Sequence, residues 1–269
     1  MDELAVRTVG QHGPHVMFLH GLFGQGRNFT TLAKRLAEGG RQVSMVDLPN
    51  HGHSPWSAGH SYPQMAEQVT ALLANQPEPV VLVGHSMGGK VAMTVALSRP
   101  ELVRALVVVD IAPVSYPPDR AGSPFAEYVQ AMRSIDLSAL HERSEADAVL
   151  APVVPDAGVR AFLLQSLVRD PSADPPWRWR LNLPVLAEHL GELTRFPDPV
   201  PGAHYDGPVL WIAGASSGYV SPADRPAMNA WFPQTRLVRI KGAGHWVHSE
   251  QPGVFLDVLS HFLDELTAV

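Results

Sequence analysis

The chain has 269 residues and a 45% hydrophobic composition, enough to bury the core of one large domain or two small ones. Its 20 basic and 26 acidic side chains give a formal net charge of −6, which argues against binding nucleic acid or an anionic membrane. No cysteine is present, which excludes disulfides, thiolate metal sites and a cysteine nucleophile. We expect a globular monomer or homodimer that acts on a small neutral molecule, without a metal or cofactor.

The N-terminal residues Met1 to Leu4 lack the basic and apolar regions of a secretion signal. No apolar run approaches the ~20 residues that span a bilayer. The sequence therefore predicts a cytoplasmic protein without membrane insertion.

Short apolar runs alternate with helical patterns in much of the chain, which is typical of a parallel sheet with crossover helices. The expected strands are residues 16–19, 42–46, 80–83, 105–109, 209–213 and 236–240. The expected helices around them are residues 28–38, 62–75, 88–98, 222–231 and 252–266. The sequence therefore predicts an α/β fold with a mostly parallel central sheet flanked by helices.

The strand pattern disappears between about residues 113 and 205. Helical stretches separated by loops rich in Pro and Asp replace it, at residues 124–135, 138–151, 156–168 and 184–193. An all-helical insertion in an α/β sheet favours a lid over an independent domain. We expect a core of residues 1–112 and 206–269, with a helical cap of residues 113–205 inserted after the strand that ends at Asp110.

A Gly-x-Ser-x-Gly pattern, Gly84 to Gly88, joins an expected strand to an expected helix. A side chain on so sharp a turn needs neighbours without Cβ atoms, because the backbone there is strained and tightly packed. The following helix directs free N–H groups toward the place where negative charge would develop. We predict that Ser86 is a nucleophile. The alternative, an idle serine in a tight turn, is disfavoured by the flanking strand and helix.

A second loop, His20 to Gly24, also follows a buried strand. Acyl transfer needs two backbone N–H donors at the oxyanion. We expect Met87, directly after the nucleophile, and Leu22 to supply them, with Phe23 as the alternative if the loop is registered one residue later. A loop that only bends away from the sheet is the competing interpretation.

His245 lies in a glycine-rich turn after the last expected strand, where a base can reach back over the sheet. Among the 13 histidines it alone combines a strand end, a flanking glycine and a position after the serine. We predict that His245 is the general base. His20 and His85 flank motif positions and are expected to be structural, with His85 also at the edge of the pocket.

A base of this kind needs a carboxylate that orients it and stabilises its imidazolium. Many hydrolases carry that carboxylate after the strand at residues 209–213, but the loop 214–219 contains none. Asp110 instead ends the strand at residues 105–109, on the carboxyl edge where the catalytic residues of open α/β sheets gather. We predict Asp110 as the acid and Ser217 as a hydrogen-bond partner of the Asp110–His245 pair.

Two other aspartates and a pair of histidines have structural interpretations. Asp224 is the main rival for the acid, but its sequence context is typical of a helix start. Asp47 is expected to brace its loop through His51. His51 and His53 could be a metal pair, yet no third ligand lies in an evident cluster, so a loop role is favoured.

These segments resemble the α/β-hydrolase superfamily and, within it, a serine esterase subgroup of YbfF-like and ABHD-eleven-like proteins. The resemblance spans nearly the whole chain and is patchy over residues 113–205. It implies a Ser-Asp-His-Ser arrangement, which falls on Ser86, Asp110, His245 and Ser217. The matching stretches are residues 20–24, 47–54, 84–90, 110–114, 179–183 and 242–252.

The predicted function is two-step hydrolysis of small-molecule carboxylic esters with short to medium acyl chains, through an acyl-enzyme on Ser86. Because the base must be neutral, activity should rise as pH climbs through roughly 6–7. Thioester, lactone, amide and carbon–carbon bond hydrolysis and perhydrolysis use the same triad and stay open, as does a non-catalytic ligand-binding protein on this scaffold.

Aromatic and other apolar side chains of the cap and core are candidates for the substrate pocket, the alternative being ordinary packing of cap on core. Those from the core are Phe23 and Trp246, beside His85. Those from the cap are Phe125, Tyr128, Met132, Phe162, Leu163 and Trp179.

Overall fold

A seven-stranded sheet organises the computed structural model, which describes residues 3–116, 124–199 and 201–267. Within these residues the strand order is β1-β3-β2-β4-β5-β8-β9, and only β1 is antiparallel to its neighbour. The expected mostly parallel sheet is confirmed. Its strands are β1 (Val6–Val9), β2 (His15–Leu19), β3 (Gln42–Val46), β4 (Val80–His85), β5 (Val103–Val109), β8 (Val209–Gly214) and β9 (Thr235–Ile240).

The edge strand β1 was not expected from the sequence. Its side chains are exposed or half-buried, so it lacks the apolar run that marks the buried strands. An edge strand of this kind closes the sheet without contributing much to the core.

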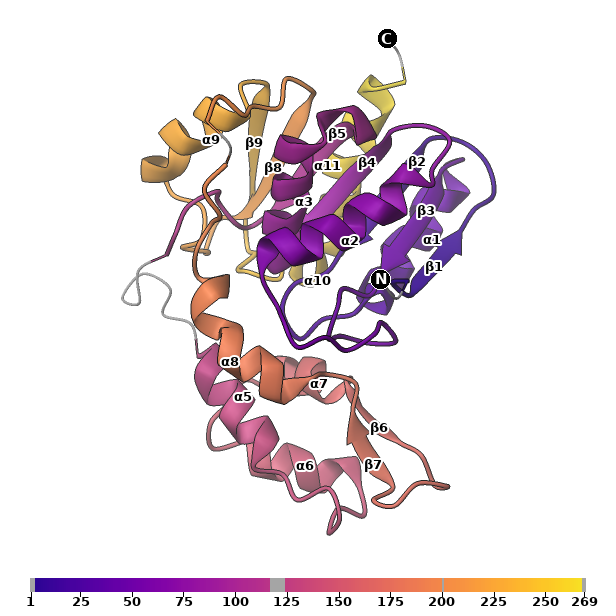
Figure 1. Ribbon diagram of the computed structural model, residues 1–269, viewed down its shortest axis with the longest axis vertical. Coiled ribbons are helices and arrows are strands. Elements are labelled where there is room, and N and C mark those ends of the chain that lie inside the picture. Colours follow the sequence, from indigo (N-terminus) through magenta and orange to yellow (C-terminus); the bar gives the residue numbers. More distant parts are fainter. Residues whose placement is uncertain (1–2, 117–123, 200, 268–269) are drawn as a thin grey trace.

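Helices cover both faces of the sheet (Figure 1). Because side chains alternate along a strand, Val16 and Phe18 pack with α1 (Thr30–Glu38) and α11 (Pro252–Glu265). Met17 and Leu19 point the other way, toward α2 (Tyr62–Ala74) and α3 (Met87–Ser98). The shorter helices of this part are η1 (Gly26–Phe29), η2 (Pro100–Leu102), η3 (Pro222–Asp224), α9 (Arg225–Trp231) and α10 (Val247–Glu250).

The segment between β5 and β8 forms a separate lobe at one end of the sheet layer (Figure 1). We call residues 124–199 the helical lobe. It contains α5 (Phe125–Arg133), α6 (Arg143–Leu150), α7 (Ala157–Leu164), β6 (Leu167–Arg169), β7 (Trp177–Trp179) and α8 (Leu183–Leu193). No described helix, here or in the sheet layer, is both long and apolar enough to cross a bilayer.

The expectation that this lobe is all helical was wrong. β6 and β7 pair as an antiparallel hairpin, with Leu167 opposite Trp179. The helix expected at residues 156–168 ends at Leu164 for this reason. Trp177 and Trp179 are buried while Arg178 between them is exposed, which is the period of a half-buried strand. Three residues are too few for that period to stand out in the sequence.

Lys90 on α3 is fully buried and joins the sheet layer to the helical lobe. Its Nζ donates hydrogen bonds to the carbonyl oxygens of Thr194 (3.1 Å) and Arg195 (2.6 Å), just past the end of α8. It also lies 4.8 Å from the ring centre of Tyr116 and 5.4 Å from that of Tyr62. Burial lowers the pKa of Lys90 to about 7. The ammonium stabilises the negative end of the α8 dipole.

Lys90→Ala should lower the free energy of unfolding by about 3 kcal/mol, because two carbonyls lose their donor and a packed stem is removed. Urea unfolding followed by circular dichroism measures the change. The matched control is Lys34→Ala, at an exposed position of α1, which should change stability by no more than about 0.5 kcal/mol. Equal losses for the two variants would contradict this role of Lys90.

Candidate active site

Ser86 occupies the turn between β4 and α3 with a backbone φ of +52°, a region that L residues rarely adopt. Its N–H donates to the carbonyl oxygen of Val109 at 3.0 Å, which holds the turn against β5. A Cβ at Gly84 would lie 2.2 Å from the carbonyl oxygen of Gly88, and one at Gly88 would lie 2.4 Å from that of Leu19. Both glycines are therefore required by close backbone approach.

His245 lies between Ser86 and Asp110, within hydrogen-bond distance of both. Its Nε2 is 3.0 Å from Ser86 Oγ and its Nδ1 is 2.8 Å from Asp110 Oδ2. Because an ionised carboxylate only accepts hydrogen bonds, Nδ1 carries the proton and Nε2 is free to accept from the serine hydroxyl.

Asp110 is fully buried, and both of its carboxylate oxygens accept hydrogen bonds. Its Oδ1 accepts the N–H of Gly214 at 2.9 Å, and its Oδ2 accepts the hydroxyl of Ser217 in addition to His245. The Ser217 hydroxyl oxygen in turn accepts the N–H of Tyr219 at 3.2 Å. The structure therefore brings together the four residues that the sequence nominated for catalysis.

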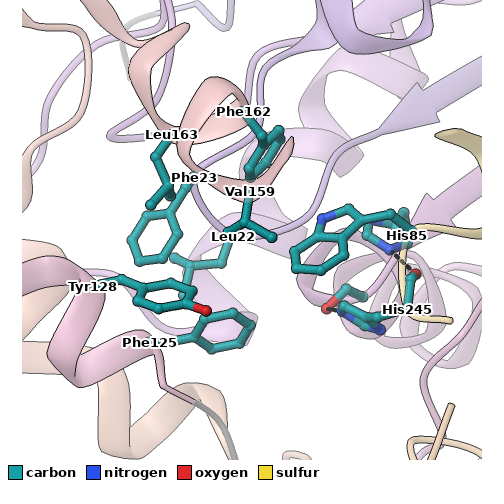
Figure 2. Close-up of a pocket in the computed structure, with 11 residues that line it drawn as sticks. Leu22, Phe23, His85, Phe125, Tyr128, Val159, Phe162, Leu163 and His245 are labelled. Carbon is teal, nitrogen blue, oxygen red and sulfur yellow. Dashed lines mark hydrogen bonds between the residues drawn. The ribbon is translucent and has the colours of Figure 1, made fainter. Parts of the chain in front are cut away.

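The His245 side chain is held in place from two further directions. The Tyr219 ring lies 4.2 Å from the imidazole centre at an angle of 31°. His85 Nε2 lies 2.9 Å from the carbonyl oxygen of His245 (Figure 2). The loop that carries His245 is thereby fixed to the end of β4, directly before Ser86.

The backbone N–H groups around Ser86 differ in whether they already donate a hydrogen bond within the protein. Phe23 N–H donates to His51 Nε2 at 3.2 Å, which removes it as a free donor. Met87 is the first residue of α3, where a helix N–H has no intrahelical acceptor. Leu22 N–H donates to no group within the described parts of the chain. This pattern favours the Leu22 and Met87 pair over the Phe23 alternative.

The loop after β3 is braced differently from the expectation. Asp47 accepts hydrogen bonds from the N–H groups of Gly26 (2.6 Å) and His53 (2.8 Å), and its Oδ2 lies 3.3 Å from His53 Nδ1. It therefore acts through His53, not through His51. His51 instead supports the loop that holds Phe23. Among the residues that the structure describes, no group of three or more His, Asp or Glu side chains could hold a metal ion.

The rival acid Asp224 serves the start of a helical segment, as its sequence context indicated. Its Oδ2 accepts the N–H of Ser221 at 2.7 Å and the Ser221 hydroxyl at 3.0 Å. The first of these bonds is one half of a reciprocal capping box at η3, in which the Ser221 side chain in turn accepts the backbone N–H of Asp224.

Two cavities meet at Ser86, and we call them the His245 cavity and the α8 cavity. The His245 cavity runs between the helical lobe and the His245 loop (Figure 2). Most of the pocket residues expected from the sequence line it: Phe23, His85, Phe125, Tyr128, Phe162, Leu163 and Trp246. Trp179 and Met132 do not belong to its lining, because Trp179 pairs within the β6–β7 hairpin and Met132 is buried inside the lobe.

The α8 cavity, of about 340 Å³, was missed by the sequence analysis. It begins at Ser86 and Met87 and reaches the end of α8. Ile111 and Tyr219 in its wall follow the ends of β5 and β8, so the rule that sites form at the carboxyl ends of strands could have found them. The residues from α2 and α8, including Tyr62, Leu190, Gly191 and Leu193, gave no such signal.

Comparison with known proteins shows extensive similarity. Residues 14–252 match the family described as alpha/beta hydrolase fold. The chain is 43% identical to the sn-1-specific diacylglycerol lipase ABHD11 of Mus musculus, over 93% of this chain and 81% of that protein. It is 36% identical to esterase YbfF of Escherichia coli, over 93% of each chain. The solved structure of a marine microorganism esterase superposes with a TM-score of 0.92 and 33% identity, over 97% of this chain and 100% of that one.

Buried histidines surround the site and should make the protein sensitive to acid. They are His20, His51, His60, His85 and His248. Burial lowers the pKa of each, and lowers those of His60 and His248 to about 4. Between these values and the ordinary pKa of about 6.5, the unfolded state binds more protons than the folded state. The stability is therefore complete above about pH 7 and is lost as pH falls through this window.

Thermal and urea unfolding of the wild type should show a free energy of unfolding that decreases from pH 7 to pH 5. His60→Gln should flatten this dependence by up to about 1.4 kcal/mol per pH unit, since it removes one proton-binding group. His12→Gln is the control, because His12 is exposed in the loop between β1 and β2. Identical pH dependence in wild type and His60→Gln would contradict the prediction.

Proposed function

The chain belongs to the alpha/beta hydrolase fold family, and we propose that it cleaves carboxylic esters with short to medium acyl chains through Ser86, His245 and Asp110. The observation that carries the proposal is the continuous hydrogen-bonded series from Ser86 Oγ through His245 to the buried Asp110. The esterases and lipases among its relatives support an ester-hydrolysing enzyme.

In the first step, His245 Nε2 takes the proton of the Ser86 hydroxyl while Oγ attacks the carbonyl carbon of the ester. The carbonyl oxygen becomes an oxyanion, and the N–H groups of Leu22 and Met87 donate hydrogen bonds to it. The imidazolium then gives its proton to the leaving alcohol oxygen as the carbon–oxygen bond breaks. The acyl group remains on Ser86.

In the second step, His245 takes a proton from water, and the resulting hydroxide attacks the acyl carbon. The imidazolium returns its proton to Ser86 Oγ as the acid leaves. Asp110 stabilises the imidazolium in both steps without taking its proton. Ser217 keeps the Asp110 oxygen that faces His245 hydrogen-bonded, which supports the orientation of the carboxylate.

The helical lobe acts in this proposal as a cap over the core. Its α5 and α7 supply Phe125, Val159 and Phe162 to the cavity beside Ser86. The core would then comprise residues 1–112 and 206–269 and the cap residues 113–205. Such a wall excludes water from the acyl-enzyme until the leaving alcohol has departed.

Ser86→Ala should lower kcat/KM by about 10³-fold or more on p-nitrophenyl esters from acetate to decanoate, because the attacking oxygen is lost. Ser98→Ala is the control, since Ser98 is an exposed serine at the end of the same helix. A fluorophosphonate should label wild type and Ser98→Ala with one equivalent and leave Ser86→Ala unlabelled. Equal hydrolysis by all three proteins would refute the proposal.

The acid is tested by comparing two carboxylates. Asp110→Asn should lower kcat by about 10⁴-fold, because the amide favours the wrong tautomer of His245. Asp224→Asn should leave kcat within about threefold, since it affects a helix start. Ser217→Ala should lower kcat by a factor between those of Asp224→Asn and Asp110→Asn. If Asp224→Asn proved the more damaging change in steady-state assays, the acid would have to be reassigned.

A further inference from the structure

We propose that the acyl chain of the substrate lies in the α8 cavity, that the leaving alcohol lies in the His245 cavity, and that Gly191 sets the length of acyl chain accepted. The inference rests on the proposed function and adds to it a direction of substrate binding and a specificity-determining residue.

The direction follows from where protons must travel. The proton that His245 Nε2 takes from Ser86 must reach the leaving oxygen, so the alcohol has to lie on the His245 side of the attacked carbon. His245 and Trp246 are in the wall of the His245 cavity. The α8 cavity shares Ser86 and Leu22 with it but is bordered by Met87 instead of His245 within the described residues. The acyl substituent therefore points toward the α8 cavity.

The two cavities also differ in size and shape in the way this assignment requires. The free space of the His245 cavity is about 10 Å³, and the Phe162 and Trp246 rings approach to 6.1 Å across it. The α8 cavity offers about 340 Å³ between mainly apolar side chains. A flexible hydrocarbon chain gains free energy in proportion to the apolar surface that it buries, so the larger apolar space suits it. The His245 cavity encloses only about the volume of one water molecule, so it holds the part of the alcohol next to the ester oxygen, and the rest of the alcohol projects beyond it.

Gly191 lies in the last turn of α8, where it is exposed and lines the α8 cavity. Its backbone does not adopt a positive φ, so its conformation does not demand glycine. A Cβ at this position would meet no heavy atom within 4 Å, so packing does not demand glycine either. Glycine weakens a helix relative to alanine. What the missing side chain does provide is open space in the wall of the cavity on α8.

A large side chain at position 191 should therefore remove room for the distal carbons of long acyl chains only. Burying one methylene of the acyl chain should raise kcat/KM about fourfold. For the wild type, kcat/KM should therefore rise by about this factor with each added carbon until the acyl chain reaches α8. In Gly191→Phe, the rise of kcat/KM with acyl length should stop at a shorter chain. The effect should grow with acyl length and be nearly absent for acetate.

The experiment measures kcat/KM for p-nitrophenyl acetate, butyrate, hexanoate, octanoate and decanoate, which share one leaving group. Gly191→Phe should stay within about twofold of wild type on acetate and lose about tenfold or more on octanoate and decanoate. The matched control is Gly253→Phe, an exposed helical glycine in α11 whose Cβ would also meet nothing within 4 Å. It should follow the wild-type profile. Gly191→Leu gives a second, smaller obstruction should the phenylalanine variant fold poorly.

A second series keeps the acyl group constant and varies the alcohol, using phenyl, 4-nitrophenyl and 1-naphthyl acetate. Gly191→Phe should leave the ratios in this series unchanged. A change in the alcohol series with an unchanged acyl series would overturn the assignment, as would the same acyl profile for Gly191→Phe and Gly253→Phe. Failure of the proposed function has a different signature, since the wild type would then hydrolyse no ester in a Ser86-dependent way, and both proposals would fall.

Discussion

The buried carboxylate of Asp110 is the feature on which the rest of this site depends. A charge without solvent exposure is costly unless donors satisfy it, and here three donors come from two separate parts of the chain. Gly214 N–H ends β8, the Ser217 hydroxyl belongs to the loop after it, and His245 Nδ1 belongs to the loop after β9. The interactions that satisfy the carboxylate are thus the same ones that orient the imidazole toward Ser86.

The order of the strands makes this convergence possible. β4, β5, β8 and β9 are consecutive neighbours and run parallel, so their carboxyl ends lie side by side. Ser86, Asp110, Ser217 and His245 each follow one of these ends in turn. The sequence analysis could nominate Ser86, Asp110 and Ser217 because each follows a buried apolar run, and runs of that kind need no long-range information to recognise. His245 follows β9, whose side chains are mostly half-buried or exposed, and it was nominated from its glycine-rich turn and its position after the serine. The same reasoning explains why Asp224 was a weaker candidate, since it begins a helical segment instead of ending a strand.

Other features depend on contacts that no local pattern contains. Leu22 is favoured over Phe23 because His51, 28 residues away in sequence, accepts the N–H of Phe23. The partner of Asp47 is His53 because the turn between them brings the backbone N–H of His53 to the carboxylate. The β6–β7 hairpin and the edge strand β1 are too short or too exposed to show a hydrophobic period. In these cases, either the interacting residue lies outside the local sequence pattern, or the strand is too short or too exposed to show a hydrophobic period.

Ser86 and the end of α8, which lines the α8 cavity, are both held by contacts to α3. Lys90 lies one helical turn after Ser86, and its ammonium holds the carbonyl oxygens of Thr194 and Arg195 at the end of α8. Tyr62 and Tyr116, which flank the ammonium, also line the α8 cavity. The distance from Ser86 to Gly191 is therefore fixed by buried contacts to one helix, not by the mutual packing of the cap helices alone. In the proposed binding mode, a wall anchored in this way would let the protein discriminate acyl chains by length, because α8 is held at a fixed place relative to Ser86.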